Sequence, residues 1–229
     1  YIIRDVRDGV GTITFNKPEV HNAFDDEAAL EWHDALVWAT ENKDIRILIL
    51  RGEGKSFHTG RDTRAMGVRD PGISHWDFLK QGQKKIGMLV NMDKPTIAAV
   101  KGGTIGGGAE IALACDMRVS STDLKMSLPE VKYSLAVDQG GSAMLTSLIG
   151  PSKAKWMLMS GDSVDAQTAL YWGLVDFVVP PEDLDNKVYE MAGKIAKNPR
   201  QAVLCARELV NELWADGVRA AIRREYINQ

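Results

Sequence analysis

Hydrophobic and polar positions divide the first 180 residues into strands and helices that follow one another in turn. Short apolar or β-branched segments bounded by Gly, Pro or Asn predict strands. The predicted strands cover residues 10–15, 45–50, 96–100, 117–120, 124–127 and 175–179. The segment 45–50 is almost continuously apolar, which is typical of a strand in a sheet that is covered on both faces.

Between these strands, apolar residues recur at the three- and four-residue spacing of helices. The predicted helices cover residues 26–40, 77–92, 140–149, 152–160 and 165–172, together with a helix that runs through Cys115. Asp25 or Asp26 can cap the first helix, which places Leu30, Leu36 and Val37 on one face. Residues 70–76 are predicted to form a loop.

After Pro180-Pro181 the pattern is helical to the end of the chain, with a break near Asn198-Pro199. Strand–helix alternation followed by helices alone indicates the α/β class. We therefore expect an α/β core over residues 1–180 and a helical C-terminal region over residues 181–229.

Length and charge narrow the class of protein. A chain of 229 residues with 45% hydrophobic residues is long enough for one domain with a sizeable core. The net charge is −3, the pI is about 5.9, and the basic residues are scattered. This balance gives no indication of a basic surface for nucleic acid.

The cysteines and the apolar runs indicate a compartment. Cys115 and Cys205 lie in apolar surroundings and are interpreted as buried, reduced thiols, which fits a reducing environment. No apolar run approaches membrane-spanning length, and the start at Tyr1 has no signal-peptide pattern. The missing initiator Met suggests that the start was trimmed. We expect a cytoplasmic protein without membrane contact, with an organellar matrix as the alternative.

The most informative segment is the glycine-rich turn at Gly106–Gly108. It follows the strand 96–100 and opens a helix, so its N–H groups can meet a ligand at the positive end of the helix dipole. A phosphate or an oxyanion on a carbonyl would fit, and so would close packing of helix on sheet. The spacings of a phosphate loop and of a dinucleotide-binding turn are both absent.

Acidic residues near this turn are candidates for acid–base chemistry. Glu110 lies one turn into the helix among small and apolar residues, so its carboxylate should be paired or functional. Glu130 ends a short predicted strand after Pro129. Asp138 precedes a Gly-Gly helix start, where a helix N-cap is the simpler interpretation.

Other candidates are weaker. The four histidines, His21, His33, His58 and His75, are interpreted as packing or surface residues. No Ser/His/Asp order and no metal-ligand spacing is present, so no metal site is predicted.

Several motifs together resemble the crotonase superfamily, the enoyl-CoA hydratase/isomerase family, over nearly all of the chain. Two of them precede the glycine-rich turn, at 16–24 and at Phe57-His58-Thr59-Gly60-Arg61-Asp62. A third, Lys94–Gly102, leads into the turn at Gly106–Gly108. Two more follow it, at Ala114-Cys115-Asp116-Met117-Arg118 and over 158–175. The resemblance implies a twisted spiral of ββα units and an acyl-CoA thioester as substrate, with no other cofactor.

The resemblance also implies roles for individual residues. The backbone N–H groups of Arg61 and Gly107 would form an oxyanion hole that stabilises a thioester enolate. An arginine departs from the smaller or apolar residue common at that position; its side chain would point to solvent or contact a CoA phosphate or an anionic acyl group. The implied substrate- and CoA-binding residues are Asn22, Ala23, Thr59, Gly60, Asp62, Thr63, Arg64 and Gly106. Trp76 and Phe78 are candidates for lining the acyl pocket.

The acids leave more than one reaction open. Glu110 and Glu130 match the two glutamates of family hydratases, where one activates water and the other protonates the α-carbon. Asp138 lies eight residues beyond Glu130, as an acid does in dienoyl-CoA isomerases, which would use Glu130 and Asp138. Hydration of a 2-enoyl-CoA is the leading hypothesis. A crotonase-type C–C bond hydrolase is a further alternative, and a non-enzymatic scaffold or RNA-binding relative is the last.

By resemblance the chain would form a homotrimer or a dimer of trimers. It ends at Gln229, whereas family members usually run longer, so we expect a truncated C-terminal region. In family members this tail often caps the acyl pocket, so the sequence leaves open which acyl group the protein accepts.

Overall fold

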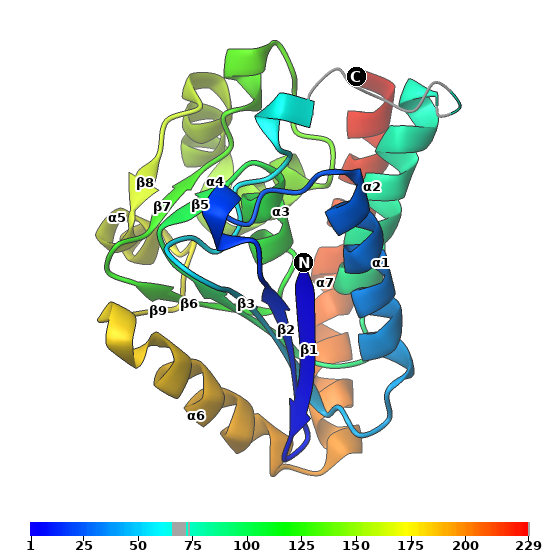
Figure 1. Ribbon diagram of the computed structural model, residues 1–229, viewed down its shortest axis with the longest axis vertical. Coiled ribbons are helices and arrows are strands. Elements are labelled where there is room, and N and C mark those ends of the chain that lie inside the picture. The colour runs from blue at the N-terminus through cyan, green and yellow to red at the C-terminus, as the bar shows by residue number, and fades with distance from the viewer. Residues whose placement is uncertain (66–71, 73, 229) are drawn as a thin grey trace.

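The computed structural model describes residues 1–65, 72 and 74–228, and it contains two β-sheets enclosed by helices (Figure 1). The larger sheet has the strand order β1-β2-β3-β4-β6-β9. Its strands are β1 Ile2–Arg7, β2 Val10–Phe15, β3 Ile47–Gly52, β4 Thr96–Val100, β6 Met117–Ser121 and β9 Phe177–Val179. β1 pairs with β2 in antiparallel fashion, and every later pair of this sheet is parallel.

A smaller sheet carries the strands β5 Gly103–Ile105, β7 Lys125–Ser127 and β8 Val164–Asp165. The chain passes from β4 into β5 and from β6 into β7, so consecutive strands belong to different sheets. A helix or helical turn follows each such pair. This repeated crossing produces the predicted crotonase-like spiral, and the predicted α/β class is confirmed.

Seven α-helices surround the sheets in the described part of the chain. They are α1 Asp26–Glu41, α2 His75–Val90, α3 Gly107–Leu113, α4 Gly141–Ser160, α5 Ala166–Trp172, α6 Leu184–Ala196 and α7 Arg200–Asn228. Short 3₁₀ helices lie at η1 Pro18–Val20, η2 Thr63–Ala65, η3 Glu130–Tyr133 and η4 Pro181–Asp183. Figure 1 shows α6 on one side of the large sheet and α1, α2 and α7 on the other.

Both faces of the large sheet are buried at β3, as the apolar segment 45–50 predicts. In β3, Leu48 and Leu50 belong to the main core, whereas Ile47 and Ile49 pack with residues of α6. Alternating side chains of one strand therefore fill two separate layers of core.

Helix boundaries follow the local signals closely. Gly150 has φ 76° and ψ 165° and divides α4 at the predicted position. Gly173 ends α5 in the left-handed conformation, and α6 and α7 are separated near Pro199. Both C-terminal helices contact earlier elements, and the domain boundary at residue 180 stays a prediction.

Three expectations need correction. Leu30 is 62% exposed, because α1 buries Ala28, Trp32, Ala35, Leu36 and Ala39 instead. α2 begins and ends two residues earlier than predicted, so it includes residues 75 and 76 of the predicted loop 70–76, while residues 70, 71 and 73 lie outside the described residues. Cys115 is buried but Cys205 is exposed on α7, so only one thiol fits the expected environment.

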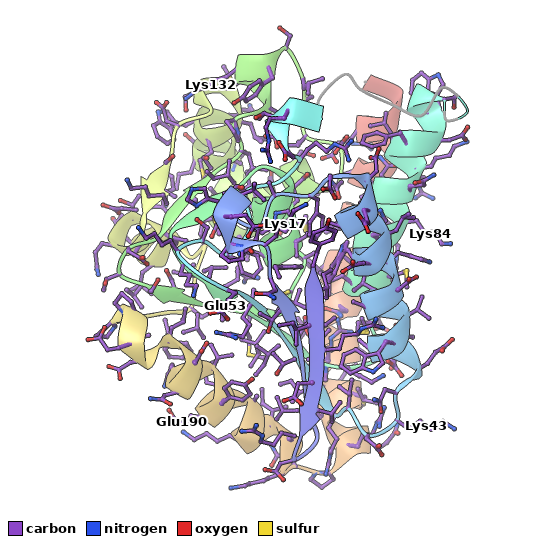
Figure 2. All side chains as sticks on the ribbon, viewed as in Figure 1. Lys17, Lys43, Glu53, Lys84, Lys132 and Glu190 are labelled. Carbon is purple, nitrogen blue, oxygen red and sulfur yellow. The ribbon has the colours of Figure 1, made fainter. Side chains whose placement is uncertain are left out.

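Labelled charged side chains lie both along the outline of the molecule and across the face that is viewed (Figure 2). Figure 2 shows Lys43, Lys84 and Lys132 at three separate places on this outline, which agrees with scattered basic residues. Glu190 lies on the outer side of α6. Within the described ranges, no helix combines the length and the apolar character needed to cross a bilayer.

Candidate active site

The glycine-rich turn connects β5 to α3 and lies against the loop that follows β3. Gly106 adopts φ +57°, and its N–H donates to the Ser127 carbonyl of β7 at 2.9 Å. A Cβ on Gly108 would lie 2.0 Å from the His58 carbonyl oxygen. A side chain at either position would be strained or would clash, which accounts for glycine at both.

The two predicted oxyanion loops are in direct contact. The Ile105 N–H donates to the His58 carbonyl at 3.0 Å. A Cβ on Gly60, which has φ +81°, would lie 3.2 Å from the Gly107 nitrogen and 3.0 Å from the Ile105 oxygen. The structure therefore brings Gly60 and its neighbour Arg61 to the first turn of α3.

The backbone leaves two N–H groups free at this contact. Phe24 N–H donates to the Gly60 carbonyl at 2.8 Å, and Asp62 N–H donates to the Phe24 carbonyl at 2.9 Å. In such a parallel bridge, the N–H of the central residue, Arg61, points away from Phe24. Among the described residues, neither Arg61 N–H nor Gly107 N–H has a protein acceptor. Two free donors beside each other can stabilise an oxyanion.

His58 supports the first of these loops from inside the core. Its Nδ1 accepts the Gly60 N–H at 2.8 Å, and its ring packs against Phe15 and Phe24. Burial lowers the pKa of His58 to about 3, so the ring is neutral at neutral pH and carries its proton on Nε2. The packing interpretation of this histidine is confirmed.

The buried neutral ring makes a prediction for acid stability. Below pH 6.5 His58 is protonated in the unfolded chain, whereas in the folded protein it stays neutral down to about pH 3. The contribution of His58 to stability therefore decreases as the pH falls from 6.5 toward 3. The stability difference between the unaltered protein and His58→Asn should shrink by about 1.4 kcal/mol per pH unit below 6.5. Urea unfolding from pH 7 to pH 4.5 measures it. His33→Asn, at a partly exposed position, is the control, and an equal slope for both variants would contradict the prediction.

The Arg61 side chain has a partner within the chain. Its Nη1 lies 2.7 Å from Asp26 Oδ1 at the start of α1, and its guanidinium lies 5.3 Å from the centre of the Phe78 ring. The guanidinium is thus neither directed freely into solvent nor unpaired. Contact with a CoA phosphate or an acyl group stays a prediction.

The residues predicted to bind CoA come together because the Phe24–Arg61 bridge joins their two loops. Asn22 is buried, and its Nδ2 donates to the carbonyls of Glu53, Ser56 and Phe57, so its side chain anchors the loop. Ala23 is also buried beside it. Asn22 and Ala23 can therefore act through the shape of the loop.

The other predicted binding residues lie on the adjoining segment from β3 to η2. Thr59 Oγ1 donates to the His21 carbonyl at 3.1 Å, and Thr63 and Arg64 form η2. Arg64 Nη2 lies 2.6 Å from Asp62 Oδ2. This hydrogen bond holds the pKa of Asp62 low, at about 2. The exposed Arg64 supplies a positive charge at this edge.

Glu110 and Glu130 reach the turn from different elements. Glu110 is buried in α3, where its Oε1 accepts the N–H groups of Gln139 and Gly141 at 3.0 Å each. Glu130 begins η3 instead of ending a strand, a correction of the predicted element. Its Oε1 lies 3.0 Å from the place of a Cβ on Gly106, and its Oε2 is buried without a partner among described residues.

Asp138 lies in the loop before α4, but it is not the helix N-cap. Gly140 occupies that position, with no side-chain cap, and carboxylates from α3 and α7 accept the first N–H groups of α4. The N-cap interpretation is therefore wrong. Two distant glutamates perform the function that the local sequence assigned to Asp138.

Burial raises the pKa values of all three predicted acids. The pKa of Glu130 rises to about 7 and that of Asp138 to about 6, in each case mainly through burial. Burial also raises the pKa of Glu110 well above its usual value, with further increases from the charges of Asp138 and Glu130. Such a cluster retains protons near neutral pH, and it can divide into a proton donor and a proton acceptor.

Two residues at this site escaped the sequence analysis. Gln139 packs between α2 and the turn: its Nε2 lies 3.3 Å from the place of a Cβ on Gly107, and it contacts Gly82. Glu225 of α7 is buried and accepts the N–H groups of Gly140 and Ser142. No local pattern marks Glu225, because its contacts lie more than 80 residues away in sequence. In the described part of the chain, no group of three or more His, Cys, Asp and Glu side chains is arranged for a metal ion.

Comparison with known proteins agrees with this geometry. The sequence model of the enoyl-CoA hydratase/isomerase family matches residues 5–226. The chain is 34% identical over 212 residues to the crotonyl-CoA hydratase of Syntrophomonas wolfei, which covers 92% of this chain and 81% of that one. It is also 34% identical to the short-chain-enoyl-CoA hydratase of Clostridium acetobutylicum, over 92% of this chain and 80% of that one.

Solved structures give the same result. An enoyl-CoA hydratase/isomerase from Xanthobacter autotrophicus Py2 superimposes with a TM-score of 0.90 at 31% identity, covering 98% of this chain and 84% of that chain. With the family model matched over nearly the whole length, the chain belongs to the enoyl-CoA hydratase/isomerase family.

Proposed function

We propose that this protein catalyses the reversible syn hydration of a 2-enoyl-CoA to a 3-hydroxyacyl-CoA. The observation that carries the proposal is the placement of Glu110 and Glu130 beside two free backbone N–H groups. Relatives named as crotonyl-CoA and short-chain-enoyl-CoA hydratases support it. The substrate is an acyl-CoA thioester, and its CoA is part of the substrate and not a separate cofactor.

The oxyanion hole activates the thioester in this proposal. The N–H groups of Arg61 and Gly107 donate to the thioester carbonyl, which draws electron density from the C2=C3 double bond. Water then adds at C3, and the pair of electrons moves through C2 onto the carbonyl oxygen. Fixed donors favour this enolate more than the neutral thioester, because the charge is larger in the transition state.

The surroundings of the two glutamates favour different roles. Burial and the neighbouring carboxylates raise the pKa of Glu110, but its Oε1 accepts two N–H groups where α4 begins, and these stabilise the ionised form. We therefore assign Glu110 as the base that accepts a proton from water. Glu130 has a pKa of about 7 and a buried oxygen without a partner, so we assign it as the acid that protonates C2. One proton is accepted and one is delivered, so each hydration consumes one water molecule.

The CoA portion would lie along the joined loops of residues 22–24 and 59–64. Asn22, Ala23, Thr59, Gly60 and Gly106 shape these loops, and Asp62, Thr63 and Arg64 stand at their outer end. The Arg64 side chain is 72% exposed, which suits contact of its guanidinium with a phosphate of CoA.

We also propose that the protein assembles as a homotrimer or a dimer of trimers. Large apolar side chains of α4 and α5 are exposed in the single chain, among them Trp156 at 46%, Met159 at 74% and Tyr171 at 85%. An exposed cluster of this kind is typical of a protein–protein contact. The cytoplasm is the proposed location, with an organellar matrix as the alternative.

A dienoyl-CoA isomerase is the second candidate, and Asp138 is the observation that favours it. Its pKa of about 6 lies close to that of Glu130, and both carboxyls are largely buried. Such a pair could move a proton along a conjugated acyl chain. A C–C bond hydrolase has no comparable observation in its favour.

Asp138→Asn separates the two reactions. Crotonyl-CoA and a 3,5-dienoyl-CoA are offered to the unaltered protein and to the variant. The loss of enoyl thioester from the first and the gain of 2,4-dienoyl-CoA from the second are followed by absorbance. We expect crotonyl-CoA to be hydrated by both, with less than about a tenfold change in kcat, since general acid–base catalysis by a lost group would cost 10²-fold or more. If the unaltered protein does not hydrate crotonyl-CoA but forms a 2,4-dienoyl-CoA, and this product disappears with Asp138→Asn, the protein is the isomerase instead.

A further inference from the structure

One side of α7 is pressed against the turn that carries Asp138. Val218, Ile222 and Glu225 recur at four- and three-residue spacing and so share this side. A Cβ on Gly140, which has φ +92°, would lie 3.1 Å from Ile222 Cγ1 and 3.4 Å from Val218 Cγ1. Side-chain bulk at Gly140 would therefore push α7 away from the turn.

Gln83 of α2 closes the same contact. Its Nε2 donates to the Asp138 carbonyl at 2.9 Å and to the Ile222 carbonyl at 3.0 Å. Three elements that are distant in sequence thus meet at the residues just before α4.

Two carboxylates accept the four successive N–H groups of residues 139–142, where α4 begins. Glu110 Oε1 accepts those of Gln139 and Gly141. Glu225 accepts the two N–H groups that alternate with these, with Oε2 2.6 Å from the Gly140 nitrogen and Oε1 3.0 Å from the Ser142 nitrogen. The first N–H groups of a helix have no partner within the helix, and negative charge is favourable there.

We propose that Glu225 is a positioning residue of the active site, an inference that rests on the hydration proposed above. By holding the N–H groups of Gly140 and Ser142, its carboxylate keeps the turn from Asp138 to Ser142 in place. Glu110 then receives only the other two N–H groups and presents its free oxygen in one orientation. Without Glu225, the two released N–H groups would compete for the Glu110 carboxylate and change its position.

The charge of Glu225 acts on the same site. After burial, its like charge is among the causes that raise the pKa values of Glu110, Glu130 and Asp138. These carboxyls face it from α3, η3 and the loop before α4.

Basic side chains nearby are directed elsewhere. On α2, the charge of Lys85 interacts with Arg61 and Asp26. On α7 itself, Arg223 and Arg224 are exposed. A neutral residue in place of Glu225 should therefore lower the pH at which the catalytic acids ionise.

The test compares Glu225→Gln with Glu212→Gln, which removes the same charge from an exposed position of α7. Carboxyl titrations of both variants are followed by NMR with ¹³C-labelled Glu and Asp, and kcat/KM for crotonyl-CoA is measured against pH. For Glu225→Gln we expect titration midpoints at the site to move down by about half a unit or more, the acid limb of the profile to move with them, and kcat to fall at least about tenfold. Glu212→Gln should behave as the unaltered protein.

Several outcomes would overturn the inference. Unchanged midpoints in folded Glu225→Gln would make Glu225 a structural helix cap only. If that variant does not fold, Glu225→Asp decides: its shorter carboxylate should withdraw from Gly140 and Ser142 and lower kcat at least about tenfold with little change in KM, and unaltered kinetics would refute the role. A protein that does not hydrate crotonyl-CoA but shows the NMR shifts would refute the proposed reaction and leave the positioning role standing.

Discussion

Glu110→Gln and Glu130→Gln are each expected to lower kcat for crotonyl-CoA hydration by about 10²- to 10⁴-fold. In the first variant the base that accepts a proton from water is absent, and in the second the donor to C2 is absent. Binding of CoA relies on the loops 22–24 and 59–64, so KM should change little. Stopped-flow or steady-state absorbance of the enoyl thioester measures both constants.

The two glutamates should also act as a unit. Since hydration needs one proton accepted and one delivered, the double variant should be little slower than the slower single variant. Glu190→Gln is the matched control, because Glu190 lies on the outer side of α6, where it pairs with Lys194 (Figure 2). Hydration that persists at more than about a tenth of the normal rate in the double variant would refute the assigned roles.

Gly60→Ala is expected to reduce kcat by about 10²-fold or more, although it replaces none of the catalytic carboxylic acids. Its Cβ would lie 3.2 Å from the Gly107 nitrogen and 3.0 Å from the Ile105 oxygen, at a backbone φ of +81°. The loop must then move away from the turn, which separates the N–H groups of Arg61 and Gly107. The positive φ adds strain of about 1–3 kcal/mol, so the variant should also unfold at lower denaturant.

Gly193→Ala supplies the control for this substitution. Gly193 lies in α6 with nothing within 4 Å of a Cβ, so alanine there should raise stability by about 1 kcal/mol and leave hydration unchanged. The activities of Gly60→Ala and of the unaltered protein are compared without denaturant, at a temperature at which circular dichroism shows the variant to be folded. Full activity in that folded variant would mean that the oxyanion is bound elsewhere.

Local signals in the sequence were sufficient for most of the fold. Gly150, Gly173 and Pro199 mark real helix boundaries, because positive φ and proline geometry act on adjacent residues alone. The strand β1 has no such signal: its residues are mostly exposed, so its alternation is weak. In the second sheet, the predicted strand 124–127 is confirmed as β7, whereas β5 and β8 were not predicted, since they are only three and two residues long.

The residues of the site also divide into those that could be predicted from the sequence and those that could not. The glycines at 106–108 could be recognised from sequence because three in succession are costly unless the backbone needs them. The partners of the first α4 N–H groups could not, because Glu110 lies 31 residues from Gly141 and Glu225 lies 83 residues from Ser142. Local reasoning assigned the cap to Asp138, whereas tertiary contacts leave Asp138 free to be an acid.

Reaction of crotonyl-CoA with the protein in D₂O, followed by proton NMR, distinguishes syn hydration from the other reactions. We expect 3-hydroxybutyryl-CoA with a hydroxyl from solvent at C3 and a single deuterium at C2, added to the same face of the double bond. Formation of this product should be lost in Glu130→Gln. Unchanged crotonyl-CoA together with conversion of a 3,5-dienoyl-CoA to the 2,4-dienoyl-CoA would refute hydration as the reaction of this protein.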